Sequence, residues 1–180
     1  MKVFAFAGST SSASINKKLV HYALQHFKSE DVHFIDLNDY AMPVFCVDLE
    51  KDGFPSEAHA FLKNIENCDV ILCSLAEHNR SYAAAFKNVF DWCSRINVKV
   101  FQDKPMFLMT TSPGGYGGGN VMAEASKFFP QFGADIRGSF SLPKFYENFD
   151  EENGIINPEL KQEVDSKIIE FKKTLHDGAA

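Results

Sequence analysis

The segment GSTSSASIN, residues 8–16, concentrates side chains that bind anions. It holds five Ser or Thr hydroxyls and one Asn. It follows the apolar run KVFAFA (2–7) and leads into SINKKLVHYALQHF (14–27), whose apolar residues recur at helical spacing. A helix N-terminus presents unpaired backbone N–H groups and the positive end of the helix dipole, so this loop favours phosphate. The alternative is a serine-rich turn with Ser14 as an ordinary N-cap.

Two common nucleotide motifs are missing from this segment. Without GxxxxGK[ST] a nucleoside triphosphatase is disfavoured, and without GxGxxG the usual dinucleotide fingerprint is not present. Hydroxyls and amides without a lysine suit a phosphate monoester that stays in place rather than one that is transferred.

A second polar segment, AEHNRSY (76–82), follows another apolar run. At the end of a buried strand, such residues can recognise the edge of a heteroaromatic ring, with Asn79 and backbone amides as donors. His78 or Tyr82 would then supply a stacking face. The alternatives are a solvated loop histidine at position 78 and, at Glu77, a structural cap rather than a ligand contact.

A third segment, SPGGYGGGN (112–120), holds five of the eleven glycines. Glycine permits positive φ and lets the backbone approach a ligand closely. A flexible turn is the alternative, but the place of this loop beside the other two favours a role in binding.

Five apolar runs of about strand length alternate with amphipathic segments and must position these loops. The runs are KVFAFA (2–7), VHFIDL (32–37), DVILCS (69–74), PMFLMTTS (105–112) and ADIRGSFSL (134–142). The periodicity predicts helices over 14–27, 56–67, 83–96 and 120–132, with Pro130 ending or kinking the last one. Asn157 and Pro158 are typical of the start of a further helix.

Alternating strands and helices predict an α/β fold with helices on both faces of a parallel sheet. Five strands in 180 residues fit a single three-layer doubly wound domain, residues 1–180, with strand order 2-1-3-4-5. Ligands of such folds bind beyond the carboxyl ends of the strands, where the strand order reverses. This rule selects the loops 8–16, 75–82 and 112–119.

Charge and cysteine usage exclude several classes of partner. The formal net charge is −6 without a basic stripe, which argues against nucleic acid or an anionic membrane as partner. No apolar run approaches the ~20 residues of a membrane span. The four cysteines form no CxxC pair and have no His at metal-ligand spacing, so we expect no metal site. Cys68 and Cys73 are interpreted as small buried hydrophobes, and the cytoplasm is the expected compartment.

Taken in order, the three segments resemble motifs of the NAD(P)H-dependent FMN reductases, the flavodoxin-like family that includes quinone, chromate and azo reductases. GSTSSASIN is similar to the family's GSxRxxSxN, AEHNRSYAAAFKNVFDW to its PEYNxSxPGxLKNxxDW, and SPGGYGG to its SPGxxGG. The resemblance covers roughly residues 1–140. The spaced match of FKN and DW is its most specific part.

The resemblance implies which residues bind FMN. Ser9, Ser14 and Asn16 would hold the phosphate, with help from the amides of Ser11 and Ile15. Glu77, His78 and Asn79 would line one side of the isoalloxazine ring, and Ser112 with Gly115 would close its other side. Ala76 and Arg80 complete the implied set of cofactor-binding residues.

The chain departs from the family pattern at several positions. The family's Arg in the first loop is Ser11 here, so hydroxyls and backbone must do its work, and Arg80 is a candidate for partial replacement. Ala76 replaces a Pro, His78 a Tyr, and Ala83–Ala84 a Pro-Gly pair. A less rigid second loop is therefore expected, with consequences for flavin potential or substrate access.

The resemblance implies an oxidoreductase that works by a ping-pong cycle. NADPH or NADH reduces FMN at N5, and a quinone, azo compound, metal oxyanion or second flavin then takes the electrons, with no catalytic side chain required. The helix that carries Lys87, Asp91 and Arg95 is implied to lie at a homodimer interface, within a homodimer or homotetramer. The aromatic and acidic segment 143–156 is interpreted as a flap or as a contact with a neighbouring subunit.

Two other functions remain open at this point. One is a flavodoxin-type electron carrier that uses a protein partner instead of NAD(P)H, and the other is a flavin-binding partner protein without turnover. Reduction of the flavin by NAD(P)H alone distinguishes the reductase from both.

Overall fold

The computed structural model describes residues 1–176 and contains one main sheet. Its five long strands run parallel in the order β2-β1-β3-β5-β6, and the short β4 pairs antiparallel with β3. The strands are β1 (Lys2–Gly8), β2 (Asp31–Ile35), β3 (Val70–His78), β4 (Ser81–Tyr82), β5 (Lys104–Thr111) and β6 (Ala134–Leu142). Counted along the long strands, this is the predicted order 2-1-3-4-5, which is confirmed.

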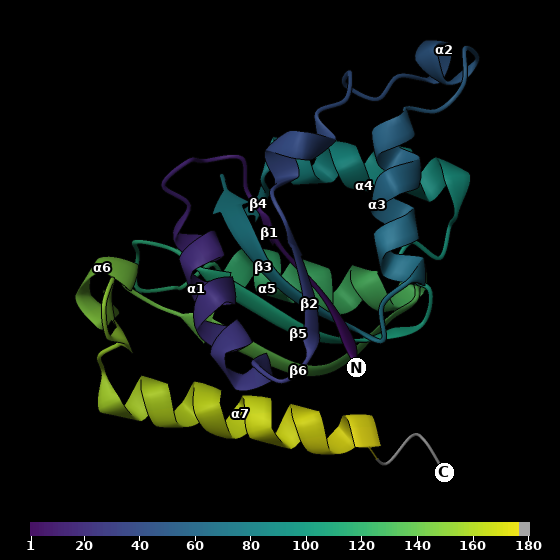
Figure 1. The fold of residues 1–180 in the computed structure, drawn as a ribbon. Coiled ribbons are helices and arrows are strands. Elements are labelled where there is room, and N and C mark those ends of the chain that lie inside the picture. Colours follow the sequence, from purple (N-terminus) through teal and green to yellow (C-terminus); the bar gives the residue numbers. More distant parts are fainter. Residues whose placement is uncertain (177–180) are drawn as a thin grey trace.

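Helices cover both faces of the sheet (Figure 1). One face packs against α1 (Ile15–Leu24) and α7 (Pro158–His176). The other packs against α3 (Ser56–Glu66), α4 (Ala84–Ile96) and α5 (Gly119–Phe128). The shorter elements are α2 (Val47–Glu50), α6 (Phe145–Asn148), the hairpin of β7 (Phe149–Asp150) with β8 (Gly154–Ile155), and 3₁₀ helices at Gln25–Phe27, Leu37–Tyr40 and Phe129–Phe132.

The strand β1 shows why the apolar runs contain almost no polar residues. Val3, Ala5 and Ala7 face α1 and α7, whereas Phe4 and Phe6 face the other helical layer, and none is more than 1% exposed. Strands that are buried on both faces read as continuous apolar runs rather than as an alternating pattern.

The predicted helix ends are confirmed where a specific residue fixes them. Ser14 Oγ accepts a hydrogen bond from Lys17 N at 3.3 Å and so caps α1. Asn157 Oδ1 accepts from Glu159 N at 3.1 Å and from Leu160 N at 3.2 Å at the start of α7. The helix α5 ends two residues before Pro130, which lies in a 3₁₀ turn.

The strand β3 is longer than predicted. Residues 75–78 were expected in a loop, but β3 continues to His78. Two neighbours sustain the extension, because Ala76 pairs with Thr111 of β5 and Glu77 pairs with Tyr82 of β4. The second loop is therefore a tight hairpin turn.

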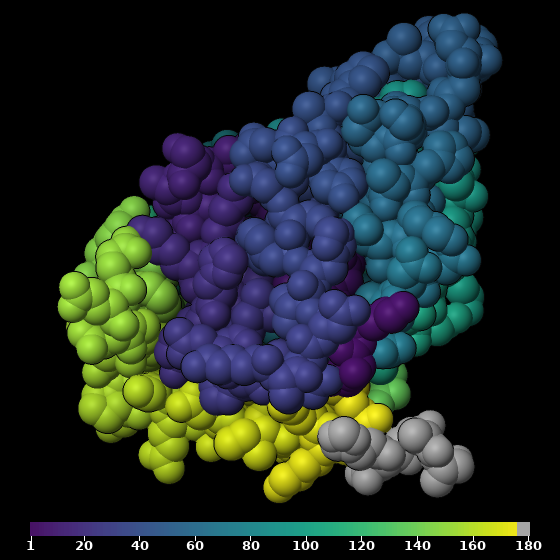
Figure 2. Space-filling view, viewed as in Figure 1, coloured from purple at the N-terminus to yellow at the C-terminus, as the bar shows by residue number. Residues whose placement is uncertain are grey.

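The segment 41–55, which carries α2, projects from the body of the molecule (upper right in Figures 1 and 2). Its base is fixed to α4, because Trp92 Nε1 and Asn88 Nδ2 donate to Pro43 O at 2.7 and 3.1 Å. Its tip carries exposed apolar side chains, among them Val44 at 81% and Val47 at 64% exposure.

The four cysteines carry free thiols. Cys68 and Cys73 are buried, as predicted, and Cys46 is exposed on the projecting segment. None of the helices within residues 1–176 combines the length and the apolar composition that a bilayer crossing needs.

Candidate functional site

A cleft of about 260 Å³ lies at the carboxyl ends of β1, β3 and β5, where the strand order reverses. Nine of the twelve predicted site residues line it: Ser9, Ser11, Ser14, Ile15, Asn16, Ala76, Glu77, His78 and Ser112. The remaining three, Asn79, Arg80 and Gly115, are outside its lining. A larger groove of about 600 Å³ runs between α3 and α4, but it includes none of these loop residues.

The N-terminus of α1 forms one wall of the cleft. Ser14 caps the helix, and the N–H groups of Ile15 and Asn16 stand at the head of it, where no preceding turn supplies a carbonyl acceptor. Both residues line the cleft. Their N–H groups and the helix dipole therefore favour an anion at this position.

Ser9 and Ser11 are connected within the same loop. Ser11 N donates to Ser9 Oγ at 3.3 Å, and Ser9 N donates to Ala7 O at 2.8 Å. Ser9 is only 6% exposed. A hydroxyl that accepts one bond can still donate another, so Ser9, which lines the cleft, can donate to a ligand there.

Asn16 connects α1 to the ends of two strands. Its Oδ1 accepts from Ser74 Oγ at 2.7 Å, and its Nδ2 donates to Thr111 O at 3.5 Å. Asn16 and Ser74 are buried. The side chain thus joins the first loop to β3 and β5, so its predicted phosphate contact would use the remaining amide proton or the backbone N–H.

The turn between β3 and β4 explains the place of Asn79 and Arg80. His78 pairs with Ser81, and the two turn residues have φ of 50° and 68°. Two successive left-handed residues form a type I′ turn, which suits Asn better than Arg. The turn carries both side chains beyond the lining of the cleft.

The carboxylate of Glu77 caps α5. Its Oε2 accepts from Asn120 N at 2.9 Å and from Val121 N at 3.0 Å, and its Oε1 accepts from Asn120 Nδ2 at 3.0 Å. This is the structural role that the sequence left open for Glu77. A role toward a bound ring stays a prediction, because the residue also lines the cleft.

The glycine-rich loop is docked on the ends of β5 and β6. Gly117 and Gly118 have φ of 62° and 80°, and Thr110 Oγ1 donates to Gly117 O at 2.8 Å. A Cβ at Gly118 would lie 2.9 Å from Thr110 Cβ, whereas one at Gly115 would meet nothing within 4 Å. The loop therefore needs glycine at 117 and 118 for its own conformation.

Four residues of the lining lie outside the predicted set: Ala13, Thr111, Pro113 and Tyr146. The first three are neighbours of predicted residues in the sequence. Tyr146 belongs to α6, which is joined to the third loop by bonds from Phe145 N to Ser112 O at 3.1 Å and from Lys144 N to Gly114 O at 2.9 Å. Tyr146 is 72% exposed, and only the aromatic character of segment 143–156 signalled it.

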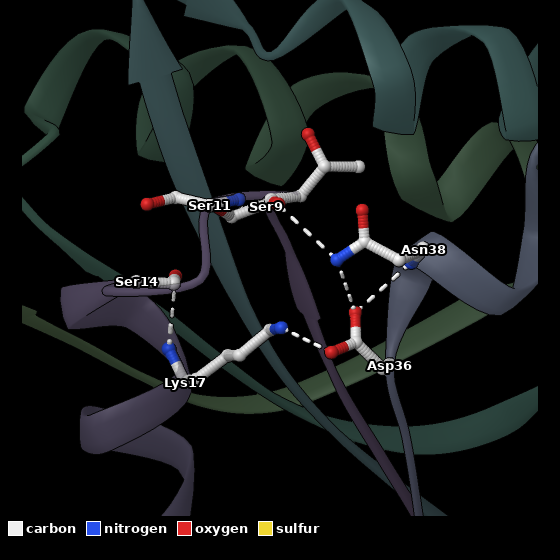
Figure 3. A network of polar contacts seen from close by, with 7 residues as sticks. Ser9, Ser11, Ser14, Lys17, Asp36 and Asn38 are labelled. Carbon is white, nitrogen blue, oxygen red and sulfur yellow. Dashed lines mark hydrogen bonds and ion pairs between the residues drawn. The ribbon is translucent and has the colours of Figure 1, made fainter.

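A polar network lies under the first loop (Figure 3). The Lys17 ammonium is paired with Asp36, whose Oδ1 accepts from Asn38 N at 2.9 Å and from Asn38 Nδ2 at 2.8 Å. Asn38 Nδ2 also donates to Thr10 O at 3.1 Å. Burial raises the pKa of Asp36, but hydrogen bonds from Lys17 and Asn38 outweigh it and hold this pKa below its ordinary value.

The donor set of the cleft suits a flat ring with a phosphate tail. Hydroxyls and free N–H groups gather at the α1 end, and backbone at 76–78 and 112–113 forms the walls beyond it. This combination fits the phosphate monoester and planar ring of FMN. The fold and the cleft together define a flavodoxin-like protein.

Residues 1–147 match the family described as NADPH-dependent FMN reductase, and the chain belongs to this family. The predicted family is thereby confirmed, as are FMN and NAD(P)H as its cofactors and the assignment of the chain to the flavin oxidoreductases.

Named relatives agree with this family. The chain is 30% identical over 175 residues to an NAD(P)H:quinone oxidoreductase of Solanum tuberosum, covering 90% of this chain and 86% of that protein. It is 34% identical over 118 residues to a 2-hydroxy-1,4-benzoquinone reductase of a Burkholderia species, covering 65% and 63%.

Solved structures share the fold. The NAD(P)H:(acceptor) oxidoreductase FerB of Paracoccus denitrificans superposes with a TM-score of 0.72 at 24% identity, over 96% of this chain and 97% of that one. An azoreductase of Bacillus anthracis gives 0.66 at 15% identity, over 98% and 99%.

Proposed function

We propose that this protein is an FMN-containing oxidoreductase that uses NADPH or NADH to reduce a small acceptor in a ping-pong cycle. The observation that carries the proposal is the convergence of the loops after β1 and β5 and the end of β3 on one cleft that begins at the Ser14-capped end of α1. Quinones, azo compounds, metal oxyanions and free flavins are the candidate acceptors. The two relatives named as quinone reductases favour a quinone.

In this proposal the chain binds and orients, and FMN supplies the redox chemistry by accepting hydride from NAD(P)H and releasing electrons to the acceptor. Ser9, Ser14 and the N–H groups of Ile15 and Asn16 hold the phosphate. Backbone at 76–78 and Ser112 form the walls for the ring, where amide donors stabilise negative charge. No side chain of the chain acts as a covalent nucleophile.

We further propose a cytoplasmic homodimer or homotetramer. The exposed apolar side chains of segment 41–55 and the adjoining α4 supply a surface for a second copy. Four free thiols suit a reducing compartment. Sedimentation velocity on Val47→Asp tests the assembly, with Ile169→Asp on α7, also an exposed apolar position, as the matched control. We expect only Val47→Asp to lower the sedimentation coefficient.

The visible spectrum of the protein supplied with FMN, recorded anaerobically before and after NADPH, tests the function. A flavin spectrum that bleaches supports the reductase. Bound flavin that stays oxidised indicates an electron carrier or a flavin-binding partner protein instead. A protein that binds no flavin overturns the proposal.

The phosphate contact has its own test. Ser14→Ala removes both the helix cap and a hydroxyl of the cleft, so we expect weaker FMN binding. Ser12→Ala is the matched control, because Ser12 is exposed and does not line the cleft. Full flavin occupancy of Ser14→Ala at limiting FMN contradicts the assignment of this loop.

A further inference from the structure

The first loop has to bind a strongly charged group without a charged residue of its own. A phosphate monoester carries about −1.5 to −2 charges at neutral pH. Residues 8–16 contain no charged side chain, and Ser11 occupies the position at which the family motif has Arg. Within the described part of the chain, the one charged residue in the lining of the cleft is Glu77, whose carboxylate is engaged by α5.

The sequence offers two cations directly after the loop, Lys17 and Lys18, and the structure separates their roles. Lys17 is held under the loop by Asp36, with its side chain 15% exposed. Lys18 is 31% exposed and pairs with Glu151, on the far hairpin. The backbone N–H of Lys17 also takes part in the N-cap of α1, because it donates to Ser14 Oγ at 3.3 Å. Lys17 is therefore bonded to the first loop through Ser14 and lies beside it in the network with Asp36 and Asn38 (Figure 3).

Asp36 fixes the Lys17 side chain and ties it to the loop backbone. The same carboxylate that pairs with Lys17 also accepts from Asn38, and Asn38 Nδ2 reaches Thr10 O at 3.1 Å. The network thus joins the cation, the end of β2 and the backbone of the first loop. A fixed, partly buried charge acts on a neighbouring anion more strongly than a solvated one, because water screens it less.

We infer that Lys17 supplies the positive charge that this chain uses for the flavin phosphate, and that Asp36 holds Lys17 in place while offsetting part of that charge. The inference rests on the proposed function, because it requires FMN in the cleft. Lys17 is thus a specificity residue for the phosphorylated flavin over riboflavin. Its contribution acts through space and the loop backbone, since it does not line the cleft.

An electrostatic role of Lys17 and a merely structural role predict different effects of Lys17→Gln and Asp36→Asn on FMN affinity. If charge decides, Lys17→Gln weakens FMN binding about five- to tenfold, and Asp36→Asn strengthens it about twofold or more. If the network only stabilises the conformation of the loop, both substitutions weaken the binding of FMN and of riboflavin to the same extent. Lys17→Arg keeps the charge and should retain the preference for FMN.

The experiment titrates the apoprotein with FMN and, separately, with riboflavin, following flavin fluorescence at low and at high salt. Lys18→Gln is the matched control, because it removes an ion-paired lysine of the same helix that faces away from the loop. Thermal melts of the apoproteins establish that each variant is folded. We expect the FMN-to-riboflavin affinity ratio to fall in Lys17→Gln, rise in Asp36→Asn and stay unchanged in Lys18→Gln, with the differences smaller at high salt.

The failures can be told apart. A wild-type protein that binds neither flavin overturns the proposed function and, with it, this inference. A wild-type protein that binds FMN and riboflavin equally overturns the phosphate assignment of the loop. Tight FMN binding in which Lys17→Gln keeps the full affinity ratio, or in which both variants shift it in the same direction, overturns the role of Lys17 and leaves the proposed function intact.

Discussion

Glu77 and Asn120 are joined by two hydrogen bonds, from Asn120 N to Glu77 Oε2 at 2.9 Å and from Asn120 Nδ2 to Glu77 Oε1 at 3.0 Å. The contact couples the end of β3 to the start of α5, and with it to the glycine-rich loop. The wall at 76–78 and the glycine-rich loop are therefore fixed to each other by this carboxylate.

Glu77→Gln should lower the free energy of unfolding by about 1–2 kcal/mol, because the charge at the N-terminus of α5 and one of two acceptor oxygens are lost. Urea denaturation measures the change. Glu124→Gln is the control, since within residues 1–176 Glu124 accepts a single hydrogen bond, from Ser81 Oγ, and caps no helix. Identical unfolding midpoints for wild type and Glu77→Gln contradict the capping role.

Two glycine substitutions should separate conformation from ligand contact. Gly118→Ala forces a left-handed residue against Thr110 and should cost about 2 kcal/mol of stability. Gly115→Ala has room in the structure and should leave the melting temperature unchanged. If the ring reaches Gly115, this second variant loses flavin affinity in a fluorescence titration without losing stability. A large loss of stability in Gly115→Ala contradicts the observed loop geometry.

The stability should depend on pH through His21, which packs on Phe34 with the ring centroids 4.4 Å apart. Burial lowers the pKa of His21 below 6.5, and the charge of Lys17 lowers it further. Below pH 6.5 the unfolded chain binds a proton that the folded chain binds only at lower pH. The free energy of unfolding should therefore be fully present above this pH and fall as the pH drops toward the lowered pKa.

Replacing His21 by Gln should flatten that dependence. Denaturant titrations between pH 5 and pH 8 measure it. His59→Gln, at an exposed position of α3, serves as the control and should keep the slope of the wild type. An unaltered slope in His21→Gln shows that another group carries the dependence.

Tyr146→Ala should weaken FMN binding about three- to tenfold, the worth of one aromatic contact. Its stability should stay within about 0.5 kcal/mol of the wild type, because the side chain is exposed. Tyr116 is a matched control, since it is 68% exposed on the glycine-rich loop yet does not line the cleft. Equal flavin affinity of the Tyr146→Ala and Tyr116→Ala variants contradicts a contact between Tyr146 and the flavin.

Features that one local stretch determines were predictable from the sequence. The caps at Ser14 and Asn157 and the end of α5 before Pro130 follow from hydrogen bonds or periodicities within short segments. The strand order was predictable for another reason, because alternating strands and helices of this number fit a doubly wound sheet. The three loops could be placed from the geometry of the sheet. A parallel sheet brings the carboxyl ends of its strands to one edge, so segments that follow these strands meet there.

Contacts between particular side chains far apart in the sequence, and the exact ends of strands, could not be predicted. Glu77 finds its partners 43 and 44 residues away, and Lys17 finds Asp36 across 19 residues. The extension of β3 to His78 depends on pairing with both β4 and β5. Tyr146 comes to the cleft because α6 is bonded to the third loop, a contact with no signal in either segment alone.

The packing of α7 has a consequence for biosynthesis. The strands of the main sheet are complete by Leu142, but Val164, Ile168 and Phe171 of α7 fill the core on the α1 face and are at most 1% exposed. A nascent chain that has emerged only as far as the end of the family match at residue 147 leaves Phe107 and Phe140 without this cover. Translation thus delays the closure of one sheet face, and the apolar surface left uncovered during that interval is of the kind that chaperones bind.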